Sequence, residues 1–301
     1  MLRATGPAHR LASTSREVSS PSSIASLVSV LVAADEAVVL RAARALWDLA
    51  ADNGISRAAI TSAGGIELLV GVLRDHSEGT QEAAAAVLWH LTAEEDATIN
   101  ASAFAAASAM PHMALLHAPD DVASQRGVSA ARRAEVTATG GIPPLVALLA
   151  SGSPGLQQVA AGVLSNVCIS HPVTRTEVVE AGGVPPLVAL LLGGAGADVQ
   201  KFAATALLHL SIDSSVNRSA IVAAGGLPPL IALLDSRNVG VQGAAAAALG
   251  NLVEGSGPNK EEVHAHALES CATSTRPFAT LAAPRCLRVH VTSVPCLFLC
   301  R

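Results

Sequence analysis

The chain has 301 residues, of which 50% are hydrophobic but only 2% aromatic and 14% charged, and its formal net charge is −5. A negative chain offers no positive field to phosphates, so this composition argues against DNA or RNA binding. Four Phe, two Trp and no Tyr leave few rings for base stacking. No apolar run reaches the roughly 18 residues that a membrane-spanning helix needs. These figures predict a soluble, helix-rich protein.

The N-terminal segment, residues 1–21, differs from the rest in composition. It carries Arg3, Arg10, Arg16 and several Ser, with no acidic residue before Glu17, and so resembles an organelle transit peptide. Its amphipathic pattern is poor, however, which favours a disordered tail. Organelle targeting stays open as an alternative.

Two phrases then repeat along the chain in a fixed order. The first is a Gly-Gly pair followed by aliphatic residues, and its second Gly falls at Gly65, Gly141, Gly183 and Gly226. The intervals are 76, 42 and 43 residues, and 76 is close to two periods of 38. The second phrase, of the type EAAAAVLWHL, follows the first at a constant distance of 25 or 26 residues. A period of about 40 to 47 residues is typical of helical solenoids.

The sequence of each repeat unit predicts three helices. A short first helix, such as NRSAIVAA from Asn217, ends at Gly-Gly because Gly accepts the left-handed conformation that ends a helix. Pro-Pro then suits the first turn of the second helix. A polar loop leads into the longest helix, whose Leu, Val and Ala bury one stripe. Since no unit can bury its apolar face alone, neighbouring units must share a core.

The second-helix phrase, followed by a third helix of the ALWNL type, resembles the armadillo repeat family over residues 22–258. The resemblance implies an all-α fold, a right-handed α-solenoid of stacked three-helix repeats. It also implies that the third helices line a concave groove for extended segments of partner proteins. Within the family, the repeats are similar to those of the yeast vacuolar armadillo protein and of plant and algal U-box ubiquitin ligases.

The pattern weakens in a degenerate unit at about residues 95–138, which has neither Gly-Gly nor Pro-Pro. Eight residues are missing before Gly140, by comparison with a later unit. Arg132 and Arg133 stand there where apolar residues are expected. We therefore predict a kink or weak point in this segment.

The C-terminal end has no complete unit. Residues 259–268 resemble the start of a truncated repeat, whereas residues 269–301 have no period and are predicted to be a disordered tail. Four of the five cysteines lie in the last 31 residues: Cys271, Cys286, Cys296 and Cys300. Their irregular spacing favours neither a disulfide framework nor a zinc site with the neighbouring His residues. We expect no metal or cofactor, and a reducing, cytoplasmic location, with the nucleus left open.

Candidate functional residues come from the resemblance, because the sequence contains no metalloprotease, serine-hydrolase, phosphate-loop or kinase signature. In many armadillo proteins one position near the end of each third helix is an Asn whose amide holds the partner's backbone. An Asn side chain offers both a donor and an acceptor. The alternative is that such residues only satisfy backbone groups at helix ends. The matching positions, which we call the ladder residues, are Asp48, His90, Asn166, His209 and Asn251.

Nuclear import receptors of the family carry a Trp four residues before the ladder Asn. Here those positions hold Arg44, Ala86, Gly162, Thr205 and Ala247. Without aromatic rings the cation–π contribution to holding Lys stems is absent, which disfavours import of basic cargo. We count Arg44 among the predicted groove residues.

The sequence therefore predicts a non-catalytic scaffold for protein or peptide partners, with no nucleic acid, no membrane insertion and no cofactor. The alternatives are the substrate-recruiting part of an E3 ubiquitin ligase system, a tether at the vacuole or another membrane surface, and a nuclear import adaptor. Partner identity and oligomeric state stay open.

Overall fold

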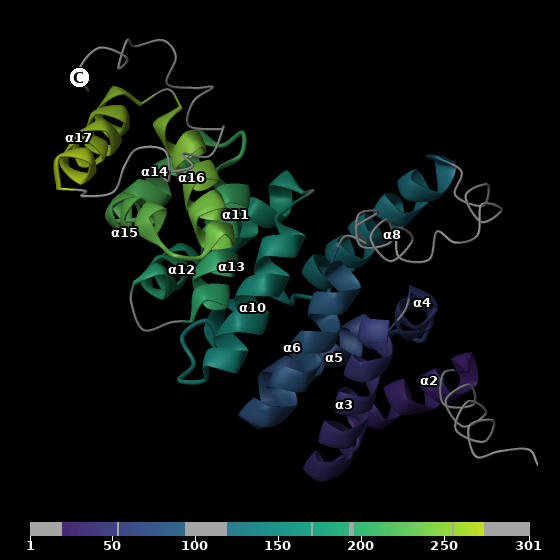
Figure 1. The fold of residues 1–301 in the computed structure, drawn as a ribbon. Coiled ribbons are helices and arrows are strands. Elements are labelled where there is room, and N and C mark those ends of the chain that lie inside the picture. The colour runs from purple at the N-terminus through teal and green to yellow at the C-terminus, as the bar shows by residue number, and fades with distance from the viewer. Residues whose placement is uncertain are drawn as a thin grey trace, which may run out of the picture. The chain divides into compact units, whose positions relative to one another are not determined.

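The computed structural model describes residues 20–52, 54–93, 119–169, 171–192, 196–254 and 256–273, and every regular element in them is a helix (Figure 1). The chain divides into two units, unit 1 (Met1–Leu148) and unit 2 (Leu149–Arg301). The predicted N-terminal tail up to residue 19 lies outside the described residues, as do residues 94–118 of the degenerate unit.

Among the described residues of unit 1, α4–α5–α6 form a complete three-helix repeat, in which α6 packs against α5 and along α3 (Figure 1). Before it, α2 and η1 pack on α3 in the place of a second helix. In chain order the elements are α2 (Pro21–Ser29), η1 (Val30–Val32), α3 (Glu36–Asp52), α4 (Gly54–Ser62), α5 (Gly65–Asp75), α6 (Glu78–Thr92), α8 (Pro119–Ala138) and α9 (Ile142–Leu148).

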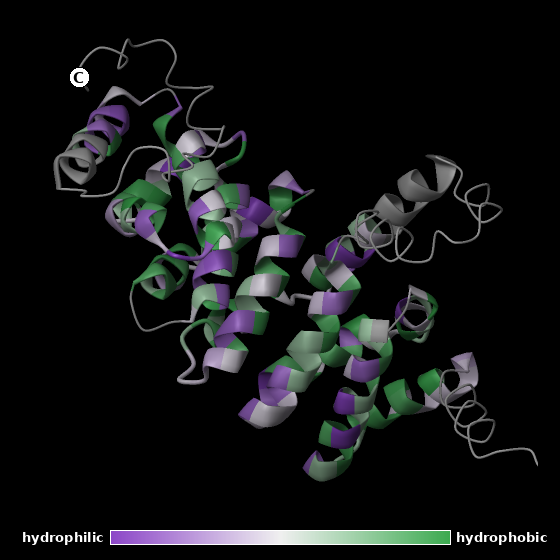
Figure 2. Cartoon of the chain, in the orientation of Figure 1, coloured by the Kyte–Doolittle hydropathy of each residue, from purple (hydrophilic) through white to green (hydrophobic). Residues whose placement is uncertain are grey.

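Unit 2 stacks three third helices, α10, α13 and α16, so that α13 packs between the other two (Figure 1). The second helices are short, and α12 is hydrophobic along most of its length (Figure 2). The elements are α10 (Pro154–Val167), α11 (Pro172–Glu180), α12 (Val184–Leu191), α13 (Ala197–Ser211), α14 (Ser215–Ala223), α15 (Leu227–Ala232), η3 (Leu233–Asp235), α16 (Val239–Val253) and α17 (Gly257–Thr273).

The Gly-Gly turn works as the sequence predicts, and the last complete repeat shows why both residues are glycine. Gly225 has a φ of 75°, a left-handed conformation that strains other L-residues. The N–H of Gly225 donates to the Val222 carbonyl oxygen at 2.9 Å, and the N–H of Gly226 to that of Ile221 at 3.0 Å, which closes the helix. A β-carbon on Gly226 would lie 2.9 Å from the Ile221 carbonyl oxygen.

The core of both units consists of aliphatic side chains and alanine. In α6 every residue from Ala83 to Leu88 is buried, with an exposed fraction of at most 1%. Alanine at such positions lets neighbouring helices approach closely, which explains how a chain with few aromatic residues fills its core.

Within the described residues no single helix is long and apolar enough to cross a membrane. Two sharply bent pairs, α4 with α5 and α14 with α15–η3, pass the same test of length and composition when each pair is taken together.

The predicted weak point is occupied by one uninterrupted helix, α8, whose side chains are described from Ser129 onward. Arg132 and Arg133 are buried, with exposed fractions of 3% and 1%. Arg133 lies eight residues before Gly141, and first helices of other repeats carry Arg at the same distance from their second Gly. The expectation of an apolar residue at Arg133 is therefore wrong, because this position of the repeat is an arginine position.

The ends of the solenoid differ slightly from the predicted bounds. Helix α2 begins at Pro21, and the Ser20 hydroxyl caps it by accepting from the N–H of Ser23 at 3.2 Å. Helix α17 takes in the predicted truncated repeat and continues to Thr273, into the first residues of the predicted tail. Residues 274–301 lie outside the described part.

Candidate functional site

The outward residues of the third helices of unit 2 share one face. In α13 the exposed or half-buried residues Asp198, Phe202, Thr205 and His209 are spaced by four, three and four, which places them on one side of the helix. Ala203, Ala204, Ala206 and Leu207, on the opposite side of the helix, are buried. We call the corresponding surface of α10, α13 and α16 the third-helix face; its members include Gln158, Asn166, Lys201, Phe202, Thr205, His209, Gly243, Ala247 and Asn251.

The ladder residues of unit 2 connect neighbouring third helices at their C-terminal ends. The His209 ring lies with Nδ1 2.8 Å from the Ser165 carbonyl oxygen of α10, and because a carbonyl only accepts, Nδ1 donates. Asn251 Nδ2 donates to Ser211 Oγ at 3.0 Å and to the Leu208 carbonyl oxygen at 3.4 Å, both in α13. His209 and Asn251 therefore reach back to the preceding repeat. Their contact with a partner stays a prediction.

The third ladder residue of unit 2, Asn166, is half-buried near the end of α10. Of the positions four residues earlier, Gly162 is buried, whereas Thr205 and Ala247 are half-buried on the third-helix face. These three residues leave no aromatic ring at the positions where import receptors carry Trp.

The ladder residues of unit 1 lie on α3 and α6, which pack side by side. Asp48 and Arg44 are exposed on α3. His90 is half-buried on α6 and stacks on Trp89, with ring centroids 5.8 Å apart. Desolvation lowers the pKa of His90, and the nearby charge of Arg57 lowers it further, so the ring is neutral at pH 7.

A carboxylate that the sequence did not single out connects α3 and α6 at their N-terminal ends. Glu36 Oε1 accepts from Ser77 Oγ at 2.6 Å, from the Ser77 N–H at 3.1 Å and from Thr80 Oγ1 at 2.5 Å. Oε2 lies 2.6 Å from His76 Nδ1. The hydrogen bonds from the side chains of Ser77, Thr80 and His76 lower the pKa of Glu36 to about 2. Glu36 thus supplies the anionic cap at the start of a helix one repeat later.

An arginine that recurs at one position of the repeat is the second feature that the sequence analysis missed. Each of these arginines stands eight residues before the second Gly of a repeat and donates from Nη1 to a carbonyl oxygen at the C-terminal end of a third helix, where a cation is favourable. Extending the comparison of repeats into the first helices would have revealed this position. The bonds are Arg57 to Ala50 at 2.8 Å, Arg133 to Thr92 at 3.3 Å, Arg175 to Ile212 at 2.7 Å and Arg218 to Ser211 at 3.2 Å.

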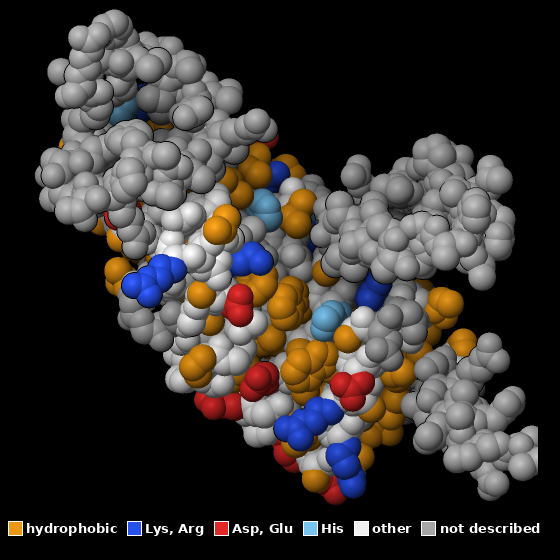
Figure 3. All heavy atoms as spheres, viewed as in Figure 1, with side chains coloured by type: hydrophobic (Ala, Val, Ile, Leu, Met, Phe, Trp, Pro, Cys, Tyr) orange, Lys and Arg blue, Asp and Glu red, His pale blue; other side chains and the backbone are white. Residues whose placement is uncertain are grey.

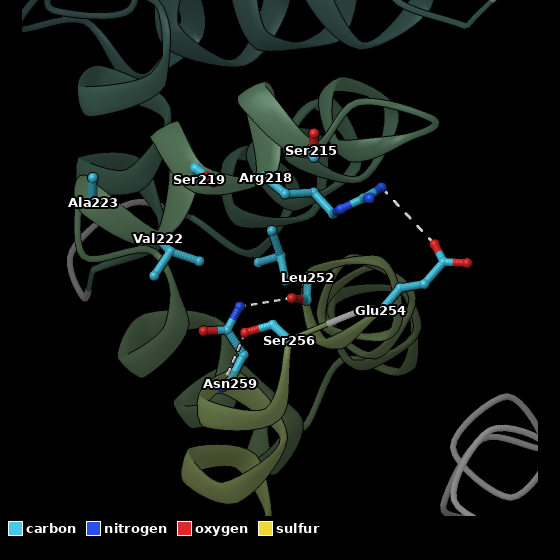
Figure 4. A pocket seen from close by; sticks show the side chains of 9 residues that line it. All are labelled: Ser215, Arg218, Ser219, Val222, Ala223, Leu252, Glu254, Ser256 and Asn259. Carbon is cyan, nitrogen blue, oxygen red and sulfur yellow. Dashed lines mark hydrogen bonds and ion pairs between the residues drawn. The ribbon is translucent and has the colours of Figure 1, made fainter.

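A hollow of about 550 Å³ lies between α14, the end of α16 and the start of α17 (Figure 4). Its polar groups already serve the packing of these helices. Arg218 lies 3.9 Å from Glu254 Oε2, and Asn259 Nδ2 donates to the Leu252 carbonyl oxygen at 2.7 Å. No ladder residue lines the hollow, so we do not assign it to partner binding.

The described residues offer little to catalysis or metal binding. Cys168 is fully buried, and desolvation raises the pKa of its thiol to about 12, so it is not a nucleophile at neutral pH. No group of three or more His, Cys, Asp or Glu side chains lies together in the described ranges. Among the His and Cys residues after position 263, only His264 has a described side chain.

Charge on the visible surface is mixed in sign. On the face shown in Figure 3, basic and acidic side chains are interspersed with apolar ones, and the described atoms there form no large surface of a single sign. This distribution does not favour a uniformly basic or uniformly acidic partner.

A family comparison covers the three-helix units found in the structure. The model of the armadillo/β-catenin-like repeat matches residues 56–93, 129–169, 171–212 and 214–254, together more than half of the chain. The match at 129–169 begins within α8, whose last turns therefore correspond to a first helix. No curated protein matches the chain.

Solved structures share the fold. An engineered protein is 29% identical, with a TM-score of 0.62 and coverage of 84% of this chain and 90% of that one. A designed armadillo repeat protein in complex with the peptide (KR)4 is 21% identical, with a TM-score of 0.63 and coverage of 84% and 93%. A chain from a structure on the interaction between cadherin and β-catenin is 19% identical, with a TM-score of 0.64 and coverage of 84% and 41%.

Proposed function

Because the chain belongs to the armadillo/β-catenin-like repeat family, we propose that it is a non-catalytic scaffold that binds extended segments of partner proteins along the third-helix face. The observation that carries this proposal is the row of half-buried polar side chains, Asn166, His209 and Asn251, near the C-terminal ends of the helices that form this face. An extended segment carries unpaired backbone donors and acceptors that such a row can satisfy.

The amide of Asn251 illustrates the proposed contact. Its Nδ2 is engaged with Ser211 and Leu208, which fixes the orientation of the side chain. Within the described residues Oδ1 accepts no hydrogen bond, so it is available to a backbone N–H of the partner. A pre-oriented acceptor loses less side-chain entropy on binding than a mobile one.

Two structural relatives support a binding role. One is a designed armadillo protein in complex with a basic peptide, and the other comes from a structure on the interaction between cadherin and β-catenin. The third-helix face of unit 2 carries few acidic side chains, since Asp198 is the one acidic residue among the outward positions of α13 and α16 carries none. We therefore propose partners other than uniformly basic segments.

The experiment uses a bulky cation placed in the middle of the third-helix face. Thr205→Arg would block the face, whereas Thr176→Arg, on the exposed side of α11, is the matched control. Peptides selected from a random display library on the wild-type chain should lose binding to Thr205→Arg and keep it with Thr176→Arg. Equal binding to both variants, with equal helicity by circular dichroism, would place the binding surface elsewhere and overturn the proposal.

The finer roles are proposals that rest on the resemblance of the repeats. A cytoplasmic location is tested by a fluorescent fusion of the full chain, for which an organelle pattern would favour the tether at a membrane surface. A substrate-recruiting role requires that a captured partner be ubiquitinated more slowly when Thr205→Arg replaces the wild type. Import of basic cargo has no support from the positions of Gly162, Thr205 and Ala247, which offer no aromatic ring.

A further inference from the structure

We propose that Lys201 makes the third-helix face of unit 2 selective for partner segments that present a carboxylate side chain, Asp or Glu. This inference rests on the proposed function, because it names the chemistry of the segment that the same face binds. It concerns one position of the segment and does not require the whole segment to be acidic.

The Lys201 side chain is held in place by its two neighbours on the third-helix face. Its stem leans on the start of α16, since a β-carbon built on Gly240 would lie 3.3 Å from Lys201 Cδ and 3.6 Å from Cε. Its Nζ lies 5.3 Å from the centre of the Phe202 ring, within the range of a cation–π contact. The ammonium group is therefore positioned between α13 and α16 with less rotamer freedom than an ordinary surface lysine has.

The charge of Lys201 is not neutralised by its surroundings. In the part of the chain that the structure describes, no carboxylate oxygen lies within 4.0 Å of Nζ. The acidic residue nearest along α13 is Asp198, which is exposed at the start of the helix. Glu254, the residue that follows α16, pairs with Arg218 at 3.9 Å. A lysine on this face without an ion-pair partner among the described residues favours a ligand that supplies one.

The neighbouring helix leaves room for that ligand. On α16 the positions equivalent to Lys201, Phe202 and Thr205 are Gly243, Ala244 and Ala247, which are not buried and carry no long side chains. A partner backbone can therefore come close to α16, and its carboxylate side chain can reach Nζ. The half-buried Phe202 ring offers an apolar surface to an adjacent side chain of the segment.

A charge-swap selection tests the inference. A random peptide library on phage is selected against the full-length wild type and, separately, against Lys201→Glu. Lys260→Glu is the matched control, because it makes the same charge change on an exposed residue of α17. We expect wild type and Lys260→Glu to enrich peptides with Asp or Glu at one fixed position, and Lys201→Glu to enrich Lys or Arg there. A synthetic acidic peptide should bind Lys201→Gln about fivefold more weakly than wild type, the size expected of one partly exposed ion pair.

The outcomes separate this inference from the proposed function. Peptides that lose binding to Thr205→Arg but show no acidic preference, or the same preference with Lys201→Glu, would overturn the role of Lys201 and leave the third-helix face as the binding surface. If the selected peptides bind Thr205→Arg as well as they bind wild type, or if selection on wild type enriches no peptide relative to selection on Thr205→Arg, both the role of Lys201 and the third-helix face as the binding surface are overturned.

Discussion

Within each unit polar side chains connect neighbouring third helices, but the two units place these contacts at opposite ends of the helices. In unit 1 the Glu36 carboxylate of α3 caps the start of α6 through Ser77 and Thr80, while Asp48 near the C-terminal end of α3 is exposed. In unit 2 the connections lie at the C-terminal ends, where His209 reaches α10 and Asn251 reaches α13. The helices are equivalent in the repeat, but the polar contacts between them are not.

This difference indicates which part of the repeat specifies the fold. The aliphatic and alanine positions are the same in both units and are buried in both, so they determine how neighbouring third helices pack. The polar contacts are added on that framework and depend on which side chain each repeat carries. A ladder position can therefore be structural in one unit and exposed in the other.

The largest effect is expected from the shared core. Leu88 of α6 and Leu207 of α13 occupy the same position, two residues before a ladder residue, and both have an exposed fraction of 0%. Leu88→Ala and Leu207→Ala should each lower the free energy of unfolding by about 2 to 5 kcal/mol, because each leaves a cavity. Denaturant unfolding measured by circular dichroism checks this. A loss below about 1 kcal/mol for one of them would show that the two cores are not equivalent.

A smaller effect should distinguish the ladder residues of the two units. Asn251→Ala removes the bonds to Ser211 and Leu208 and should cost about 1 kcal/mol. Asp48→Ala, at the equivalent exposed position of α3, should change stability by less than about 0.5 kcal/mol. Denaturant midpoints of the two variants provide the test. Equal losses of stability in the two variants would contradict the structural role of Asn251. If Asn251→Ala were as stable as wild type, it would be a clean probe of partner binding.

Most of the fold could be predicted from the sequence because it follows from local chemistry that repeats. The Gly-Gly turns need a left-handed residue and then one without a β-carbon, as Gly225 and Gly226 show, and the third helices need small and aliphatic side chains at a helical period. The Arg133 position was misjudged because it was compared with an apolar third-helix pattern instead of with the first helices that carry Arg57 and Arg218.

The site was less predictable, for a physical reason. Whether a ladder side chain faces a partner or caps a neighbouring helix depends on which atoms lie within about 3 Å of it. The Ser165 carbonyl oxygen that binds His209 is 44 residues away in the chain, and the hydroxyl that binds Asn251 is 40 residues away. The proposed role of Lys201 could not be predicted from the sequence, because it depends on the absence of an ion-pair partner within the described residues, which only the structure shows.

The N-terminal connection of unit 1 should show itself through pH. The pKa of Glu36 is lowered from 4.5 to about 2, so the folded state favours the ionised form, and this contribution is present above pH 4.5 and lost as the pH falls towards 2. Glu36→Gln should therefore lower the melting temperature at pH 7, with a difference from wild type that shrinks through this window. Glu78→Gln, at the equivalent exposed position at the start of α6, is the matched control for removing a carboxylate from the start of a third helix. A constant difference between Glu36→Gln and wild type would mean that the carboxylate charge is not what connects α3 to α6.

The smallest expected effect concerns the ladder residue His90 of unit 1. Its pKa is lowered below 6.5 by desolvation first and by the charge of Arg57 second, so protonation disfavours the folded state. The contribution of the neutral ring to stability is present above pH 6.5 and is lost as the pH falls below it. An NMR titration of the His90 ring should give a pKa below 6.5, and Arg57→Gln should raise it only part of the way, because burial against Trp89 remains. A full return to 6.5 in Arg57→Gln would reverse the order of the two causes. It would also mean that the His90 ring is exposed to solvent, so that this ladder residue of unit 1 would be available to a partner.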